Sequence, residues 1–452
     1  FCTLYSLFML ALARKELSTC SFRLFIGEKP ILPQTIEDLS TKATDEELRE
    51  AFVDEWGVKY SKDGRKLLEA PQELDRTYSI RKGTKVVCDR AFCLCSSLTE
   101  IVIPNSVASI GDSAFLGCIS LTEIVIPNSV ICLNGNPFIG WKGKLECLSP
   151  SFVYEDNILF NKDKSRIISF RNQKLTLYVI SNSVTSIGDS AFYDSRSLSN
   201  IVIPNSVTSI GDSAFEGCNS LGSLVIPNSV TNIGKGAFKW CKSLAEVVIP
   251  NSVTNIGEFA FCGCSSLAEV VIPNSVTNIG KGTFANCSYL ADVVIPDGVT
   301  SIGNNAFMSC SSLEYISLPK SVICLNGNPF FNWNGKLECL SPNFIYEDNI
   351  LFNKDKSRII SFRNQKLTSY VIPSSVTRIE DRAFSRCKSL VEVVIQNSVT
   401  SIGDRAFCGC KSLAKVVIPD SVTSIGDSAF RQDNFPYNLK QELISRFGKK
   451  IF

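Results

Sequence analysis

The residues of this sequence that could do chemistry are aspartate–serine pairs and cysteines. The segment Gly-Asp-Ser recurs at Asp112-Ser113, Asp189-Ser190, Asp212-Ser213 and Asp427-Ser428. A nucleophilic serine needs a base to take its proton, and histidine is the usual base. The sequence contains no histidine. We therefore predict that the pairs are structural, that there are no catalytic residues and that the chain is not an enzyme.

Cysteine is unusually frequent, with 19 copies. Nine of them share one position of a repeating frame: Cys95, Cys118, Cys218, Cys241, Cys264, Cys287, Cys310, Cys387 and Cys410. Neighbouring rungs of a parallel sheet lie about 4.8 Å apart, but parallel Cβ vectors would strain a disulfide. We expect a buried column of reduced thiols, with no metal and no cofactor. A zinc site at the Cys262-x-Cys264 pair and a neighbouring coil is the alternative.

The frame that positions these residues is a repeat of 23 residues. Its leading apolar residue opens thirteen units, at Val87, Ile110, Leu133, Ile187, Ile210, Ile233, Ile256, Ile279, Ile302, Leu325, Ile379, Ile402 and Ile425. A fixed period of this length predicts a solenoid, in which each coil buries its apolar residues against the next.

Each unit predicts one coil with two short strands and a turn. Leu221, Leu224 and Ile226 form an L-x-x-L-x-L strand, and Ile233 belongs to a second extended segment. Asp212 is predicted to be the N-cap of a single helical turn that points Ala214, Phe215 and Cys218 inward.

Aromatic-rich inserts interrupt the repeats. FVYEDNILFNKDKSRIISFRNQKLTLYVI recurs almost unchanged 192 residues later, and a diverged copy precedes Val87. Each insert predicts a β-hairpin, because Ile158 and Phe160 lead into an Asn-Lys-Asp-Lys turn and Ile167 and Ile168 lead out of it.

Both ends of the repeats carry helix signals. Thr44 with Glu47 predicts a capping box, and Leu439, Leu443 and Phe447 share a helical face before Gly448. The predicted segments are 1–50, N-terminal segment; 51–86, β-hairpin cap; 87–152, repeats; 153–186, hairpin insert; 187–344, repeats; 345–378, hairpin insert; 379–432, repeats; and 433–452, C-terminal capping helix.

The pattern I-G-x-x-A-F-x-x-C-x-S-L-x-x-[IV]-x-I-P-x-S-V resembles the BspA-like class of leucine-rich repeats, over about residues 80–430. This class occurs on bacterial surface proteins and in some protozoa. The resemblance implies a mainly-β, right-handed solenoid of short parallel strands and short helical turns. It also implies export and binding to proteins of a host or a neighbouring cell.

An outward-facing column on the predicted strands is the candidate binding surface. The exposed residue of each L-x-x-L-x-L strand is usually valine: Val102, Val125, Val202, Val225, Val248, Val271, Val294, Val394 and Val417. Two residues earlier there is usually an acid: Glu100, Glu123, Glu246, Glu269, Asp292 and Glu392. A long exposed apolar band usually marks a contact surface. The alternative is that valine merely suits strands and that the acids keep the sheet soluble. We predict partner binding at Glu246, Val248, Glu269, Val271, Asp292 and Val294.

The composition limits the kinds of partner that we expect for this chain. The 46 Lys and Arg nearly balance the 44 Asp and Glu, so we expect no nucleic-acid partner. We also expect no integral membrane span. Residues 1–13, which end in Ala11-Leu12-Ala13, fit either the back half of a secretory signal or a buried N-terminal helix. The sequence thus predicts a rod that binds a protein ligand, as an adhesin-like protein at the cell surface or secreted. An intracellular, cytoplasmic scaffold of the same fold is the alternative.

Overall fold

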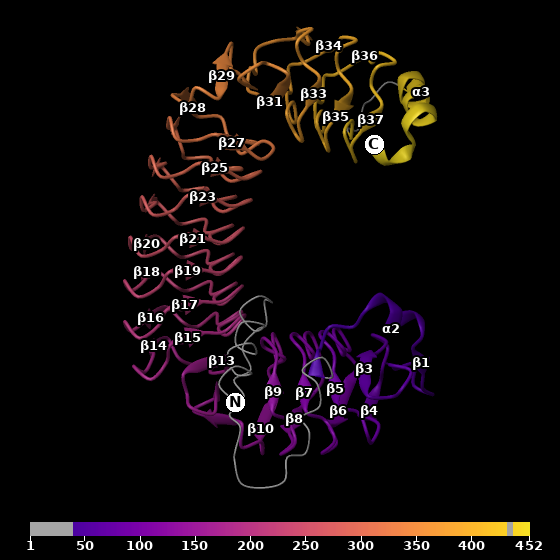
Figure 1. The fold of residues 1–452 in the computed structure, drawn as a ribbon, viewed down its shortest axis with the longest axis vertical. Coiled ribbons are helices and arrows are strands. Elements are labelled where there is room, and N and C mark those ends of the chain that lie inside the picture. Colours follow the sequence, from indigo (N-terminus) through magenta and orange to yellow (C-terminus); the bar gives the residue numbers. More distant parts are fainter. Residues whose placement is uncertain (1–38, 432–436) are drawn as a thin grey trace, which may run out of the picture. The chain divides into compact units, whose positions relative to one another are not determined.

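The solenoid predicted from the repeats is confirmed. A computed structural model of the chain describes residues 39–431 and 437–452, so the predicted signal or helix at residues 1–13 lies outside the described residues. The chain divides into two compact units, and the boundary in the sequence lies between Lys164 and Ser165. In each unit short strands of successive coils lie side by side (Figure 1). The eight-segment division made from the sequence stays a prediction.

Unit 1, which ends at Lys164, carries two strands per coil. Its main sheet runs in the order β1 (Phe52–Val53), β2 (Lys59–Tyr60), β3 (Lys66–Glu69), β5 (Val86–Val87), β7 (Ser109–Ile110) and β9 (Cys132–Leu133). The second strands of its coils are β4 (Arg76–Ser79), β6 (Leu98–Val102), β8 (Glu123–Ile126) and β10 (Lys144–Cys147). A hairpin of β11 (Phe152–Glu155) and β12 (Ile158–Asn161) follows them.

Unit 2, which begins at Ser165, continues the same plan over more coils. One parallel sheet contains β13 (Arg166–Phe170), β15 (Ser186–Ile187), β17 (Ser209–Ile210), β19 (Asn232–Ile233), β21 (Asn255–Ile256), β23 (Asn278–Ile279), β25 (Ser301–Ile302) and β27 (Cys324–Leu325). The other strands of these coils are β14 (Leu177–Val179), β16 (Asn200–Val202), β18 (Ser223–Val225), β20 (Glu246–Val248), β22 (Glu269–Val271), β24 (Asp292–Val294), β26 (Tyr315–Leu318) and β28 (Lys336–Cys339).

Unit 2 then contains a second sheet and a C-terminal helix. The elements are β29 (Phe344–Glu347), β30 (Ile350–Asn353), β31 (Arg358–Phe362), β32 (Ser369–Val371), β33 (Arg378–Ile379), β34 (Glu392–Val394), β35 (Ser401–Ile402), β36 (Lys415–Val417), β37 (Ser424–Ile425), α3 (Tyr437–Phe447) and the 3-10 helix η2 (Lys449–Ile451). The predicted hairpin β30–β31 is present, and β29 adds a third antiparallel strand to make a meander. Its last strand, β31, pairs in parallel with β33 and so starts the next set of coils.

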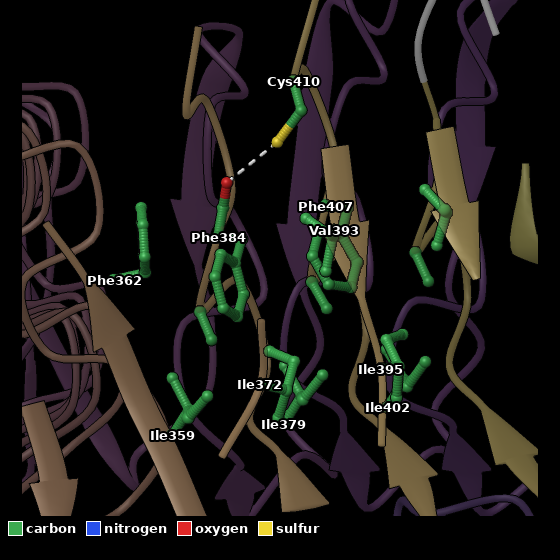
Figure 2. Close-up of a cluster of buried hydrophobic side chains, with 14 of the residues drawn as sticks. Ile359, Phe362, Ile372, Ile379, Phe384, Val393, Ile395, Ile402, Phe407 and Cys410 are labelled. Carbon is green, nitrogen blue, oxygen red and sulfur yellow. Dashed lines mark hydrogen bonds between the residues drawn. The ribbon is translucent and has the colours of Figure 1, made fainter. Parts of the chain in front are cut away.

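Columns of identical side chains fill the interior. From Phe192 to Phe330 the buried phenylalanine rings of successive coils stack with centroids 4.8–6.3 Å apart and planes within 14° of parallel. Figure 2 shows the same packing between Phe384 and Phe407, beside isoleucines of the two strand columns. A buried phenylalanine removes roughly 150–250 Å² from water. This phenylalanine column is therefore a main source of stability.

The turn that carries Phe215 differs from the helical turn predicted for it. Ser213 and Gly217 have positive φ angles of 51° and 78°, which a right-handed helix does not allow. The N–H groups of the segment alternate in direction: Ala214 donates to Gly211 within the coil at 3.4 Å, and Ser213 donates to Lys235 of the next coil at 2.8 Å. The turns thus join coil to coil, as the strands do.

The predicted N-cap role of Asp212 is wrong for the same reason. The residues after Asp212 are not helical, so their N–H groups do not converge on its carboxylate. Instead Asp212 Oδ1 accepts a hydrogen bond from the backbone N–H of Lys235, one coil on, at 2.7 Å. Asp189, Asp381 and Asp404 make the same bond to the next coil.

A glycine follows the leading isoleucine because successive coils approach closely there. A Cβ atom at Gly234 would lie 2.4 Å from the carbonyl carbon of Gly211 in the preceding coil. A larger residue at Gly234 would therefore force these two coils apart.

The two ends have the predicted helices. Helix α2 (Asp45–Arg49) begins with a complete capping box between Thr44 and Glu47. Helix α3 ends at Phe447, before Gly448 with φ 82°, and buries Leu443 against the core of the last coils. The chain after it takes the place of one more coil, because Phe430 donates its N–H to Ile451 at 2.9 Å.

The phenylalanine column gives a direct test of stability. Phe238→Ala removes the ring that stacks 5.3 Å from both Phe215 and Phe261. We expect a loss of about 3–5 kcal/mol in the free energy of unfolding, measured by urea denaturation and circular dichroism. Tyr289→Ala, where 69% of the side chain is exposed, is the control and should cost less than about 0.5 kcal/mol. Equal costs in the two variants would contradict the assignment.

Candidate functional site

The six residues predicted to bind a partner lie on one face. Strands β20, β22 and β24 each alternate exposed, buried and exposed, so the acid and the valine at their ends point outward together. The side chains of Val248, Val271 and Val294 are 48%, 70% and 67% exposed. In β22 and β24, Glu269 is in register with Asp292. The structure therefore brings the six residues together, while binding itself stays a prediction.

The acids of this stretch lack the cations that neutralise other members of their column. Glu123 pairs with Lys144 at 2.5 Å, and Glu392 pairs with Lys415 at 2.6 Å. Among residues 39–431 and 437–452, no ion pair involves Glu246, Glu269 or Asp292. Three uncompensated carboxylates thus stand beside three exposed valines.

Sequence reasoning missed two members of the valine column. Val179 of β14 is in register with Val202, and Val371 of β32 is in register with Val394. Their side chains are 61% and 54% exposed. Each lies one repeat length before its neighbour, so the 23-residue spacing extended into the inserts would have found both. Two predicted members, Val125 and Val394, are only half exposed.

The nine frame cysteines form the buried column of free thiols that the sequence predicted. Cys241 Sγ donates to the carbonyl of Phe215 in the preceding coil at 3.1 Å, and the same bond recurs in neighbouring coils. Burial raises the pKa of the Cys118 and Cys310 thiols to about 12. A nucleophilic cysteine needs a lowered pKa, so this thiol column is structural.

The Cys-x-Cys alternative finds no support in the geometry. Over the described ranges, no group of three or more Cys, Asp or Glu side chains is arranged to hold a metal ion.

The Gly-Asp-Ser segments are occupied by structural bonds. Ser213 Oγ donates to Glu216 at 2.7 Å, and Ser113 Oγ donates to Asp112 at 2.8 Å. In both pairs the serine hydroxyl thus serves a bond within its own turn.

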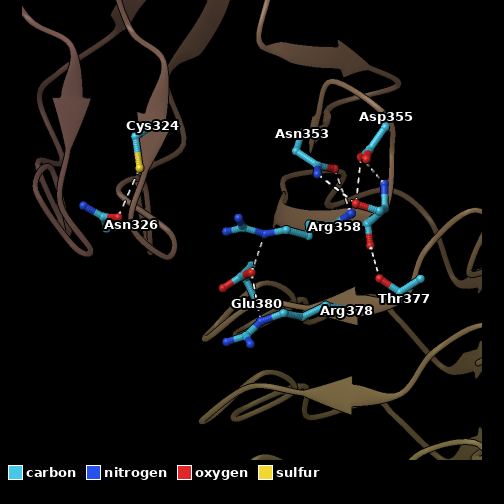
Figure 3. Close-up of polar contacts among 9 residues, drawn as sticks. Cys324, Asn326, Asn353, Asp355, Arg358, Thr377, Arg378 and Glu380 are labelled. Atoms are coloured by element: carbon cyan, nitrogen blue, oxygen red, sulfur yellow. Dashed lines mark hydrogen bonds and ion pairs between the residues drawn. The ribbon is translucent and has the colours of Figure 1, made fainter.

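A cavity of about 560 Å³ opens where the first parallel sheet of unit 2 stops at β27. Ile323, Cys324 and Leu325 line one side, and residues of the meander, including Arg358, line the other. Beside it, Arg358 and Arg378 both bind Glu380 Oε1, at 2.7 and 3.0 Å (Figure 3). Glu380 is buried. Because these charges satisfy one another, they fasten β31 to β33.

The comparisons with known proteins agree with this architecture. A family model described as a BspA type leucine rich repeat region (6 copies) matches residues 77–153, 166–291, 231–345 and 358–452. The chain belongs to the BspA-type leucine-rich repeat family. Of the described residues, none forms a helix long and apolar enough to cross a membrane.

Several solved structures of bacterial leucine-rich repeat proteins are similar to the chain. A leucine rich cell surface protein from Faecalibacterium prausnitzii A2-165 is 30% identical, with a TM-score of 0.52, over 63% of this chain and 86% of that one. A leucine-rich repeat protein from Eubacterium ventriosum is 24% identical, with a TM-score of 0.48, over 58% and 83%. One from Bacteroides ovatus is 23% identical, with a TM-score of 0.35, over 93% and 92%. The comparison with curated proteins gave no match.

The thiol column predicts a loss of stability at alkaline pH. An unfolded thiol ionises at about pH 8.5, whereas Cys118 and Cys310 hold their protons to about pH 12 in the folded chain. Between these values the unfolded state releases protons that the folded state retains. The free energy of unfolding should therefore fall as pH rises above about 8.5, by up to about 1.4 kcal/mol per pH unit for each buried thiol.

Urea denaturation between about pH 8 and 10 measures how the free energy of unfolding changes with pH. This range begins near the pKa of an unfolded thiol, about 8.5. The Cys118→Val/Cys310→Val variant should show a shallower fall than the parent chain. A control variant at the exposed Cys324, Cys324→Val, should keep the parent slope. A double variant with an unchanged slope would show that the buried thiols do not cause the effect.

Proposed function

We propose that the chain is a non-enzymatic, adhesin-like protein of the cell surface, or a secreted one, that binds a protein partner. The binding face consists of Glu246, Val248, Glu269, Val271, Asp292 and Val294. The observation that carries the proposal is the run of exposed valines beside carboxylates that have no cation. Two other acids of the same column, Glu123 and Glu392, are paired with lysine, whereas Glu100 accepts a hydrogen bond from Thr77. The binding face is thus the stretch in which three consecutive coils combine an exposed valine with an acid that forms no ion pair among the described residues.

The chemistry of the face indicates the kind of partner. Each carboxylate loses little hydration while exposed, and a cation brought by a partner would form a charge-assisted hydrogen bond. The valines beside them provide apolar surface that a partner would bury on binding. A protein surface with exposed apolar groups and arginine or lysine therefore fits this face.

The family and the fold support a binding role over catalysis. The buried thiols keep their protons and the serines are held in structural bonds. A rigid stack of coils presents an extended surface, which suits a macromolecule better than a small substrate. Similarity to the Faecalibacterium prausnitzii cell surface protein supports a location outside the cell.

A double exchange tests the binding face. Val248→Lys/Val271→Lys places two cations on the stripe, and should weaken binding of the labelled full chain to intact cells by at least about tenfold. Both positions are exposed, so circular dichroism should stay unchanged. The control variant Thr231→Lys/Thr254→Lys adds the same charges at exposed sites beside β19 and β21. Protease treatment of the target cells should abolish binding, because the partner is a protein. Equal binding by both variants would contradict the proposed face.

The location has its own test. Brief protease treatment of intact producing cells should release peptides from residues 210–300, identified by mass spectrometry. If these peptides appear only after lysis, the surface proposal is wrong and the intracellular scaffold is favoured.

A further inference from the structure

A cluster of arginines departs from the repeat frame in the last coils of unit 2. Arg382, Arg386 and Arg405 occupy turn positions that contain Ser, Gly, Phe, Asp, Trp or Asn in residues 187–310. Their φ angles are 56°, 62° and 52°, a region that disfavours any side chain larger than that of glycine or asparagine. The frame therefore does not explain why arginine is present there.

Two of these arginines share one aromatic ring. The guanidinium carbons of Arg382 and Arg386 lie 5.3 and 5.7 Å from the ring centroid of Phe331. Asn328 Nδ2 donates to the backbone carbonyl of Arg382 at 3.2 Å, which holds this turn against the preceding coil. Phe331 is half-buried, whereas Arg386 and Arg405 are exposed. The cluster is thus an apolar ring surrounded by cations at the surface.

In the part of the chain that the structure describes, the three arginines form no ion pair with a carboxylate. By contrast, Arg358 and Arg378 nearby both pair with Glu380. Burial lowers the pKa of Arg382 and the positive charge of Arg405 lowers it further, while the carboxylates of Asp381 and Asp404 act in the opposite direction without forming an ion pair. Cations that repel one another are stabilised by an anion that binds several of them together.

The same chain carries a surface of the opposite character. Arg382 and Arg405 lie one coil apart, as their backbones show, because the N–H of Arg382 bonds Asp404 O at 2.9 Å. Glu246 and Glu269 also lie one coil apart on the valine–acid face. Both charge columns therefore repeat at the rung spacing of about 4.8 Å. Each column also includes apolar surface, Phe331 in one and the valines in the other.

We propose that the arginine cluster (Arg382, Arg386 and Arg405, with Phe331) binds the valine–acid face of a second copy of this chain. The proposal rests on the proposed binding face and names a partner for it. Because the two surfaces are different, the contact is head-to-tail, and each bound copy still has one surface free for another. Self-association should therefore continue beyond the dimer as concentration rises.

Sedimentation velocity of the full chain over a range of concentrations tests the proposal. The parent chain should form dimers and larger species at about 50 mM salt, and these should weaken at about 500 mM salt. Arg382→Glu/Arg405→Glu removes one surface, and Glu246→Arg/Glu269→Arg removes the other. Each variant alone should be monomeric, with self-association at least about tenfold weaker than in the parent chain. The control Lys388→Glu/Lys411→Glu makes the same charge change at exposed lysines of the same coils and should associate like the parent.

Mixing the two variants gives the decisive result. The first keeps an intact valine–acid face and the second keeps an intact arginine cluster, so the mixture should form a complex that neither variant forms alone. A parent chain that stays monomeric, association that survives both charge reversals, or a mixture without the complex would each overturn the proposal. If the parent chain is monomeric and Val248→Lys/Val271→Lys still loses binding to cells, the proposed function stands and only the second copy is excluded.

Discussion

The distance between one coil and the next is the constraint on which the rest of the structure depends. Parallel strand pairing fixes a rung of about 4.8 Å, and the phenylalanine rings from Phe192 to Phe330 stack in the same direction with centroids 4.8–6.3 Å apart. Each interior side chain then has its own copy as its nearest neighbour above and below. A residue type that packs well at one position of a coil also packs well at the equivalent position of the next coil, because its neighbours there are the same. The repetition of the sequence follows from this packing.

The spacing between coils also explains why glycine, cysteine and aspartate occur at fixed positions of the repeat. Glycine after the leading isoleucine leaves room for the preceding coil, since a Cβ at Gly234 would collide with Gly211. A cysteine thiol is small enough for the column and can donate to the carbonyl of the coil below, as Cys410 does to Phe384 (Figure 2). Asp212 satisfies an N–H that the open turn leaves free in the next coil. The bonds of these polar groups thus run along the stack.

The sequence was sufficient to predict the solenoid, the direction of its side chains and the buried thiols, because alternation and period determine these features. It misassigned Asp212 because capping rules look for a partner three residues away, whereas the actual partner is one coil away. The same limit applied to the site. The exposure of Val248 and Val271 follows from strand alternation. The pairing of Glu123 with Lys144 depends on a side chain from the next coil, so the unpaired state of Glu246 could not be predicted.

Function in such a chain lies in departures from the frame. Interior positions are fixed by their own copies, so a partner can be recognised only through exposed positions such as the valine–acid face and through departures from the frame. Arg382, Arg386 and Arg405 take up left-handed backbone positions where other coils of unit 2 have serine, glycine, asparagine, aspartate, phenylalanine or tryptophan. Left-handed backbone conformations of this kind cost stability, and the contacts of Arg382 and Arg386 with Phe331 are part of what holds them. The absence of a counterion among the described residues points to compensation from a partner, and the uncompensated acids at Glu246 and Glu269 provide a surface of matching charge and spacing.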